Sequence, residues 1–297
     1  MGGSLSVLLQ LALDGVCLAG IYALLGSSWA IVFNTTRVFH IAHGVTFAAG
    51  GYTVLLVLSR SHLPLALALL VALAVGAILG LVFHLLLYEP LRRRGSEGMI
   101  TFVASLGAMG LCSALLLALF GANPVIPSIG LDSVINLGPG RLTEAQLLSG
   151  VVAAVVTVAL LVSWRLTWPG RAFRAVTSNP EAAAAVGIKV ARYRLFAMAL
   201  GGALAGTAGG LASLFQGASL DMVLNGVLVA ATAVLVGGIG SLPGAAVGGV
   251  LVALAMNLGI WRVSSRWQYS IVFGLLLIFM LIRPRGLLGE RLAQAEL

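Results

Sequence analysis

The sequence predicts an all-α, polytopic integral membrane protein with about eight to nine transmembrane or half-spanning helices. Of its 297 residues, 60% are hydrophobic and only 9% are charged, against about 25% charged residues in a typical soluble domain. One soluble core could not bury this much apolar surface, so the chain needs lipid as its solvent. The 38 glycines fit the same class, because glycine is more frequent in membrane helices than in soluble ones.

Apolar stretches of roughly the length that crosses a bilayer, about 20 residues, follow one another along the chain. We expect one transmembrane domain over residues 1–297 and no separate soluble domain. The predicted spans cover residues 6–33, 41–58, 65–88, 99–120, 147–164, 195–215, 223–238, 245–260 and 269–282.

The distribution of basic residues predicts the orientation. Cytoplasmic loops carry an excess of Lys and Arg. With the N-terminus outside and the C-terminus in the cytoplasm, most of the 17 Lys and Arg residues lie inside, so we expect this orientation. Basic runs such as Arg92-Arg93-Arg94 accompany no nucleic-acid-binding motif, and no nucleic acid partner is expected.

Two connecting segments are long enough to carry a function. Residues 121–144 form an outer loop whose Pro and Gly residues, Pro127 and Pro139 among them, predict a structured loop rather than a helix. Residues 165–194 form a basic inner loop that contains the stretch SNPEAAAAVGIK, residues 178–189. Asp221 is assigned to an outer loop.

A short helix is specified within the inner loop. Asn179 is a good N-cap, and Pro180 fits the first helical position. Glu181 places negative charge near the positive end of the helix dipole, and Gly187 can adopt the left-handed conformation that ends a helix. The predicted helix, residues 180–186, is too short to be stable alone. We expect it to dock on another protein or to lie on the membrane surface of its own subunit.

This stretch resembles the EAA loop of ABC importer permeases. Glu181-Ala182-Ala183 is followed by Gly187, and the surrounding TWPGRAFRAVTSNPEAAAAVGIKVARYRLF is similar to branched-chain amino acid permeases of the LivH type. The resemblance extends through GIYALLGSSWAIVF, FHIAHG, YEPLRRRG, LFGANPVIP, AVLVGGIGSLPGAAVGG and RPRGLLG, in the family's order. His40 and Ile41 replace the Asn and Phe of the family's NFAHG box.

The resemblance implies the ABC importer permease fold and a set of partners. It implies a second related permease subunit, two ATPase subunits and a periplasmic substrate-binding protein, assembled among the lipids of a bacterial inner membrane. The implied substrate is a branched-chain amino acid or another small polar solute such as an amide or urea, moved by alternating access. The implied ATPase-coupling residues are Asn179, Pro180, Glu181, Ala182, Ala183 and Gly187.

The chain carries no nucleotide-binding motif of its own. Its only lysine, Lys189, is not preceded by GxxxxGK, so ATP is expected on partner subunits and no cofactor on this chain. HExxH and GxSxG are missing as well, which favours a transport subunit over an enzyme. The alternative is a self-contained secondary transporter or channel. A broken helix at GIGSLPG favours this alternative, and the scarcity of intramembrane carboxylates opposes it.

Three polar residues are candidates for the translocation path. Asp14 lies inside the first apolar stretch. An acidic side chain within a membrane span is energetically unfavourable and is therefore a candidate functional residue. His40 and His43 lie three residues apart, on one face if they are helical. No carboxylate or cysteine is near enough in sequence to complete a metal site, so no metal is expected. The main interpretation of the pair is a polar contact at the cytoplasmic end of the second span, and a substrate or gating role is the minor one.

Glycines recur every fourth residue in two places. Small residues at this spacing let helix backbones approach closely. The pattern predicts either static packing or a sliding, hinge-like contact, and a broken membrane helix favours the second because such helices tend to line cavities. The residues are Gly202, Gly206 and Gly210 in the sixth span, and Gly240, Gly244 and Gly248 across the GIGSLPG break, which also contains Pro243.

Overall fold

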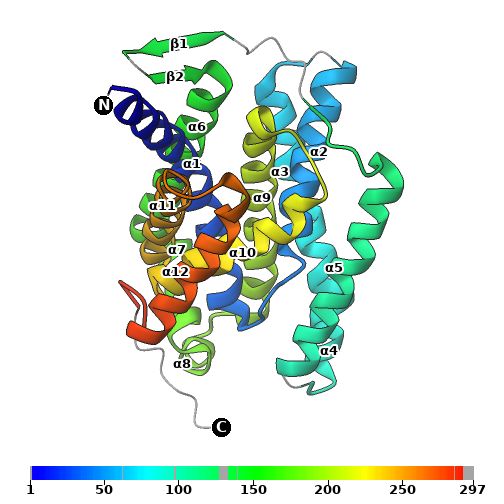
Figure 1. Ribbon diagram of the computed structural model, residues 1–297. Helices are drawn as coiled ribbons and strands as arrows, with labels where there is room; N and C mark the ends of the chain where they lie inside the picture. The colour runs from blue at the N-terminus through cyan, green and yellow to red at the C-terminus, as the bar shows by residue number, and fades with distance from the viewer. Residues whose placement is uncertain are drawn as a thin grey trace.

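The computed structural model describes residues 2–61, 63–96, 98–126, 133–138, 140–283 and 285–289. Over these residues the chain is almost entirely helical, which confirms the predicted fold class (Figure 1). The helices are α1 (Gly2–Thr36), α2 (His43–Ser61), α3 (Leu65–Val82), the π-helix η1 (Phe83–Tyr88), α4 (Glu89–Arg93), α5 (Gly98–Phe120), α6 (Glu144–Leu166), α7 (Trp168–Ser178), α8 (Pro180–Ala185), α9 (Val190–Gln216), α10 (Asp221–Gly237), α11 (Leu242–Gly259), the 3₁₀ turn η2 (Ser265–Trp267) and α12 (Gln268–Ile282).

Within the described residues, seven helical segments are long and apolar enough to cross a membrane. They are Ser6–Thr36, Leu65–Arg93, Gly98–Phe120, Glu144–Leu166, Val190–Leu214, Leu242–Gly259 and Ser265–Ile282. The two other predicted spans are α2, of 19 residues, and α10, of 17. The first turn of α2 is buried and packs on the start of α10, since a Cβ on Gly44 would overlap the Val223 backbone. At 19 residues α2 is long enough to cross a bilayer, and a half-spanning role for either helix stays a prediction.

A short β-hairpin lies at one end of the bundle. β1 (Val134–Leu137) pairs antiparallel with β2 (Gly140–Thr143) in the predicted outer loop, so the fold is not purely α. Thr143 and Gln146 then form a capping box that starts α6. Because α8 and α4 lie at the opposite end (Figure 1), we call the two ends the ribbon end and the α8 end. Pro127 and Pro139 lie outside the described residues.

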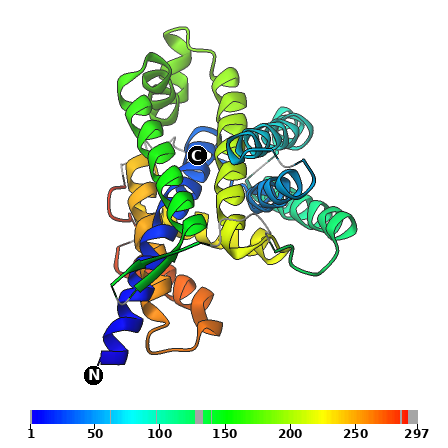
Figure 2. The same ribbon diagram turned by 90° about the horizontal axis from the view of Figure 1, so that it is seen from above.

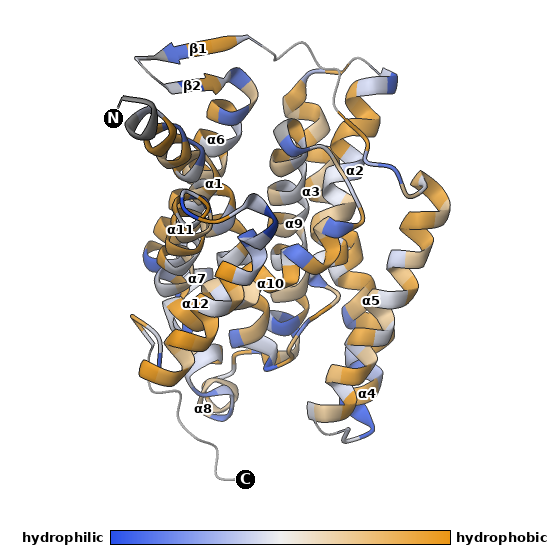
Figure 3. Cartoon of the chain, viewed as in Figure 1, coloured by the Kyte–Doolittle hydropathy of each residue, from blue (hydrophilic) through white to orange (hydrophobic). Residues whose placement is uncertain are grey.

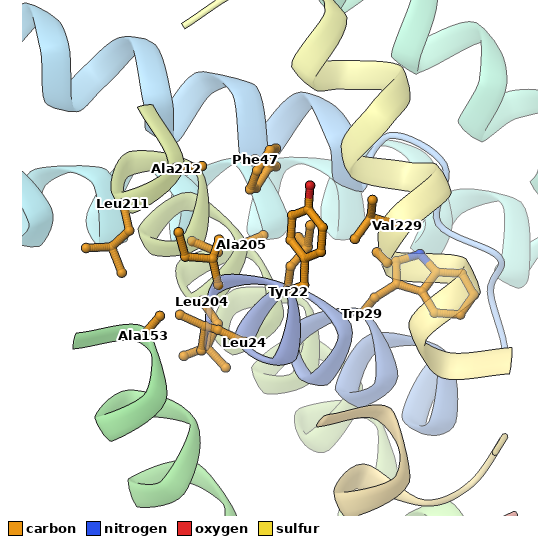
Figure 4. Packing of buried hydrophobic residues seen from close by; sticks show 14 of the residues in the cluster. Tyr22, Leu24, Trp29, Phe47, Ala153, Leu204, Ala205, Leu211, Ala212 and Val229 are labelled. Atoms are coloured by element: carbon orange, nitrogen blue, oxygen red, sulfur yellow. The ribbon is translucent and has the colours of Figure 1, made fainter. Parts of the chain in front are cut away.

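The core forms around two long helices, α1 and α9, that run in opposite directions. α1 packs mainly against α11, α9 and α6, whereas α9 packs mainly against α3 and α2 (Figure 2). Buried side chains from these and neighbouring helices form one cluster, which includes Tyr22, Trp29, Phe47 and Leu204 (Figure 4). The outer helices α5 and α12 are strongly apolar (Figure 3) and contain few buried residues, Ser105 and Leu116 on α5 and Val272 on α12, as lipid-facing helices do.

Gly202 and Gly206 let α9 and α3 approach backbone to backbone. A Cβ on Gly202 would overlap the Gly76 carbonyl, and a Cβ on Gly206 would lie 2.5 Å from the Ala72 carbonyl oxygen. A Cβ on Gly210 would lie 2.6 Å from a side chain of α2. Close packing is therefore present at all three glycines, and a hinge role stays a prediction.

Gly244 and Gly248 hold α11 against α10. A Cβ on Gly244 would lie 2.5 Å from the Gly237 carbonyl oxygen, and a Cβ on Gly248 would overlap the Ala233 carbonyl. These pairings make α10 and α11 an antiparallel pair of separate helices. They correspond to the separately predicted spans 223–238 and 245–260, and the GIGSLPG motif is the connection between the two helices.

The connection itself is a capped turn. Gly240 has φ at 90°, in the region that favours glycine, so it belongs to no helical stripe, contrary to the prediction. Ser241 Oγ accepts a hydrogen bond from the Gly244 amide at 3.1 Å, and Pro243 lies in the first turn of α11. These two residues start α11 three residues earlier than predicted.

Candidate functional site

The predicted inner-loop helix is present as α8, with both ends fixed as its sequence specifies. Asn179 Oδ1 accepts a hydrogen bond from the Ala182 amide at 2.9 Å. At the other end Gly187 has φ at 85°. Its amide bonds to the Ala184 carbonyl at 2.9 Å, and the Ile188 amide bonds to the Ala183 carbonyl at 3.0 Å. This pair of bonds is the Schellman pattern of a glycine-terminated helix.

Most of the α8 surface is open to a partner. Within the helix only Ala183 is buried, with 3% of its surface exposed. Glu181, Ala182 and Gly187 are exposed, and Val186, directly after the helix, is 76% exposed. The methyl-rich, slim surface can therefore enter a groove on another protein.

A longer helix that the sequence reasoning missed supports α8. α7 begins with Thr167 as N-cap, whose hydroxyl accepts from the Gly170 amide at 3.2 Å, and with Pro169 in its first turn. Its apolar face includes Phe173, which packs against rings of α6 and α9 at centroid distances of 5.3 and 4.9 Å. The Thr-x-Pro start signal was available in the sequence, so this part of the 165–194 loop was predictable as a helix.

Arg37 joins α7 to the end of α1. Its Nη2 donates a hydrogen bond to the Thr177 carbonyl oxygen at 2.7 Å, in the last turn of α7, where the carbonyls carry partial negative charge. Burial lowers the pKa of the Arg37 guanidinium. Arg37 also has φ at 60°, which makes it the one non-glycine residue with positive φ in the described part of the chain. Glycine would be less strained there, so the contact with α7 is what the arginine adds.

The segment after Arg37 folds back along α1 and starts α2 inside the bundle. Trp29 Nε1 donates to the His40 carbonyl oxygen at 3.1 Å. On α5, Ser105 Oγ accepts from the amides of Ile41 and Ala42 at 2.8 and 3.2 Å. These bonds satisfy buried backbone groups outside regular structure. The turn is therefore held between α1 and α5.

His40 and His43 lie together, buried, with ring centroids 5.4 Å apart. His40 Nδ1 lies 2.6 Å from the Tyr88 hydroxyl, which lies 2.9 Å from Ser105 Oγ. His43 Nε2 lies 2.8 Å from Ser28 Oγ on α1. The polar contact expected for this pair is present and fixes the start of α2. A substrate or gating role for the histidines stays a prediction.

Asp14 lies near the ribbon end, away from the two histidines. Its Oδ1 accepts from Gln10 Nε2 at 3.1 Å and from Gln146 Nε2 at 3.4 Å. Gln10 also bonds to the backbone of Arg141 in β2. The carboxylate thus ties α1 to α6 and, through Gln10, to the hairpin. Its place on a translocation path stays a prediction.

A cavity of about 220 Å³ lies between α1, α2, α10 and α12. Tyr22 lines it near the middle of the Ser6–Thr36 span, which places the cavity well within the membrane region. Figure 4 shows the Tyr22 hydroxyl between Phe47 and Val229, two further lining residues. This hydroxyl contacts Met256 Sδ at 3.7 Å, a weak bond that leaves its oxygen able to accept from a ligand.

Polar residues of α9, the α9–α10 connection, α10 and α12 line the same cavity. Asp221 is the first residue of α10, so its assignment to an outer loop is wrong. The cavity combines these groups with apolar side chains, an arrangement typical of small-molecule sites. The polar lining residues are Tyr22, Gln216, Ser219, Asp221, Asn225 and Tyr269, and the apolar ones include Leu25, Phe47, Met222 and Val229.

Several residues of this region gave no sequence signal of their role. Arg37, Tyr88, Ser105 and Asn225 act through partners or neighbours that are distant in the chain, such as Thr177, 140 residues from Arg37. Tyr88 does lie within YEPLRRRG, but that motif alone does not indicate a contact with His40. Only the fold brings these residues together.

Comparison with known proteins agrees with the fold and its apolar helices. The chain is 26% identical to the high-affinity branched-chain amino acid transport system permease protein LivH of Salmonella typhimurium, over 95% of this chain and 96% of that protein. It is 27% identical to BraD of Pseudomonas aeruginosa, a protein of the same description, with the same coverage. It is 29% identical to a probable branched-chain amino acid permease of Methanocaldococcus jannaschii, over 94% and 92%.

No solved structure matches the chain. The family model described as the permease component of branched-chain amino acid transport systems matches residues 11–281. This match covers both central helices, α7, α8 and the α10–α11 pair. The chain therefore belongs to the family of permease components of branched-chain amino acid transport systems.

Proposed function

We propose that the chain forms part of the membrane pathway of an ATP-driven importer of branched-chain amino acids. Separate ATPase subunits bind α7 and α8, and a second, related permease subunit completes the path. ATP is bound by the ATPase subunits, and this chain holds no cofactor. The α8 end faces the cytoplasm of a bacterium, and a periplasmic binding protein delivers substrate to the ribbon end. The family assignment and the names of the relatives support this class of function.

A continuous chain of contacts from α8 to α2 is the main support for the coupling proposal. α8 is exposed at the end of the bundle, and α7 packs below it against α6 and α9. Arg37 then connects α7 to the turn that starts α2. When the ATPase subunits close, they displace α7 and α8, and the rigid turn passes this displacement to α2. Since α2 borders the cavity beside α10, the same movement changes access to the cavity.

The lining of the cavity supports an amino acid as the solute. The Asp221 carboxylate can pair with an ammonium group, and the amide of Asn225 can donate to a carboxylate. Leu25, Phe47 and Val229 offer an apolar wall to a branched side chain. A simple amide or urea would use the polar lining alone, so the apolar wall favours the branched-chain amino acids.

The coupling proposal is tested by altering the positive-φ end of α8. Gly187→Val forces a β-branched residue into a left-handed conformation, which such residues avoid. We expect a tagged chain with this substitution to co-purify less of the ATPase subunits and to support less leucine uptake. Gly95→Val is the matched control, because Gly95 also has positive φ and open surroundings at the α8 end.

Normal ATPase association and normal uptake in Gly187→Val would show that α8 is not the coupling element. Transport by the purified chain along an ion gradient, without ATPase subunits, would instead support a self-contained carrier or channel. The break at GIGSLPG that favoured this alternative is the connection between α10 and α11.

A further inference from the structure

A second cavity, of about 540 Å³, opens at the α8 end, away from the central cavity. It is bounded by the end of α1, the π-helix η1, α4, the start of α5 and α9. Its lining includes three guanidinium groups, those of Arg37, Arg92 and Arg194, and one carboxylate, that of Glu89. Glu89 already forms ion pairs with Arg92 at 2.7 Å and with Arg93 at 2.9 Å. The cavity therefore carries excess positive charge.

Two buried nitrogen atoms of lining residues have no hydrogen-bond partner within the described chain. They are Nδ1 of His84, a side chain with 6% of its surface exposed, and Nε of Arg194. Buried polar groups are nearly always paired, and these two are among nine buried side-chain atoms without a partner in the described chain, so a ligand in the cavity can supply the missing bonds. His84 also lies on the π-helix, a rare element that often occurs at functional sites.

The walls of this cavity include the ends of two segments that are long and apolar enough to cross a membrane, Leu65–Arg93 and Gly98–Phe120. Met99 and Phe102 of the lining are 71% and 38% exposed, and Leu86 of the π-helix is 75% exposed. A ligand that fills this cavity therefore meets basic groups inside and apolar side chains at the rim.

We propose that this cavity binds the phosphate group of an anionic phospholipid, with the acyl chains along the exposed face of α5. Guanidinium groups form charge-assisted hydrogen bonds with phosphate oxygens, and His84 Nδ1 can supply a further donor in the matching tautomer. Basic pockets between transmembrane helices on the cytoplasmic side suit acidic headgroups. An acidic segment of a partner protein would satisfy the arginines but not the apolar rim. The site does not depend on the proposed transport function.

The proposal is tested with the purified full-length chain in mild detergent, by native mass spectrometry with added phosphatidylglycerol or phosphatidylcholine. We expect one tightly held phosphatidylglycerol and weaker binding of phosphatidylcholine. The double variant Arg92→Gln/Arg194→Gln should bind phosphatidylglycerol about thirtyfold more weakly, since each basic residue near an anionic lipid is worth roughly a fivefold factor. His84→Phe keeps the ring and removes its nitrogens, and should weaken binding by a smaller factor.

Arg165→Gln/Arg174→Gln is the matched control. It removes the same charge at the same end, from residues that line a different groove, and should bind phosphatidylglycerol like the wild type. Equal binding of the two lipids, or an equal loss in the control, would overturn the proposal. Displacement of the lipid by inorganic phosphate, without preference for phosphatidylglycerol, would assign the site to free phosphate instead. If Arg92→Gln/Arg194→Gln lost ATPase association but bound phosphatidylglycerol like the wild type, the cavity would be assigned to a partner protein instead.

Discussion

Arg37 connects two parts of the molecule that are distant in the sequence. Its guanidinium bonds to the Thr177 carbonyl at the end of α7, while its backbone starts the turn that leads to α2. The left-handed conformation costs a non-glycine residue roughly 1–2 kcal/mol. The arginine side chain therefore provides the hydrogen bond to Thr177, which an unstrained glycine at this position could not form.

Replacing Arg37 by glycine separates these two effects. Arg37→Gly relieves the backbone strain and removes the bond to Thr177, so we expect normal amounts of protein and continued ATP hydrolysis but roughly tenfold lower uptake, the order of a lost charged hydrogen bond. Uptake in cells and ATPase activity of the reconstituted importer measure this. Arg94→Gly is the control, because Arg94 is exposed at the same end and is not in the left-handed region. Unchanged uptake in Arg37→Gly would remove Arg37 from the coupling path.

Asp221 and Asp14 are the two acidic residues that are candidates for substrate binding. Asp221 lines the central cavity, whereas Asp14 is bonded to two glutamines near the ribbon end. We expect Asp221→Asn to raise the KM for leucine uptake by roughly tenfold, because a neutral amide loses the charge that pairs with an ammonium group. Asp14→Asn should change KM little. The opposite ranking of the two KM values would place the substrate path beside Asp14.

At the scale of single elements, capping residues in the sequence predicted where helices end. The sequence did not predict which helices pack against each other. The α8 boundaries follow from Asn179, Pro180 and Gly187, which lie within nine consecutive residues, and the structure confirms them. The stripe of glycines on α9 predicted close packing, but not that α3 is the partner. The position of the start of α2 also depends on contacts between its first turn and α10, which no local pattern encodes.

The α9–α3 contact has a direct test at Gly206. A Cβ there would lie 2.5 Å from the Ala72 carbonyl oxygen, so Gly206→Ala must push two helices apart, at a cost of about 1–3 kcal/mol for overpacking. We expect a lower melting temperature for the detergent-purified chain. Gly107→Ala is the matched control on α5, where nothing lies within 4 Å, and alanine should be neutral or slightly stabilising. Equal melting temperatures would contradict the rigid packing of α9 on α3.

At the scale of the whole molecule, each central helix packs mainly on helices from the other half of the chain, where the first half is α1 to α5 and the second half is α6 to α12. α1 precedes α2 but packs mainly on α11, and α9 precedes α10 but packs mainly on α3 (Figure 2). The two halves are therefore interlocked, and their relative movement must involve both α1 and α9. Periodicity along one sequence cannot reveal this exchange, because it reports that a face is buried and not which helix buries it.

The orientation of the interlocked bundle is the remaining prediction at this scale. Excess basic charge stays on the cytoplasmic side of a membrane, and Arg92, Arg93 and Arg94 lie at the α8 end. We expect the α8 end inside and the ribbon end outside. After Cys17→Ala and Cys112→Ala, a single Arg60→Cys near the ribbon end should react with a membrane-impermeant maleimide in intact cells. Arg94→Cys should react only after permeabilisation. The reverse pattern would invert the orientation and place α8 where no cytoplasmic ATPase could reach it.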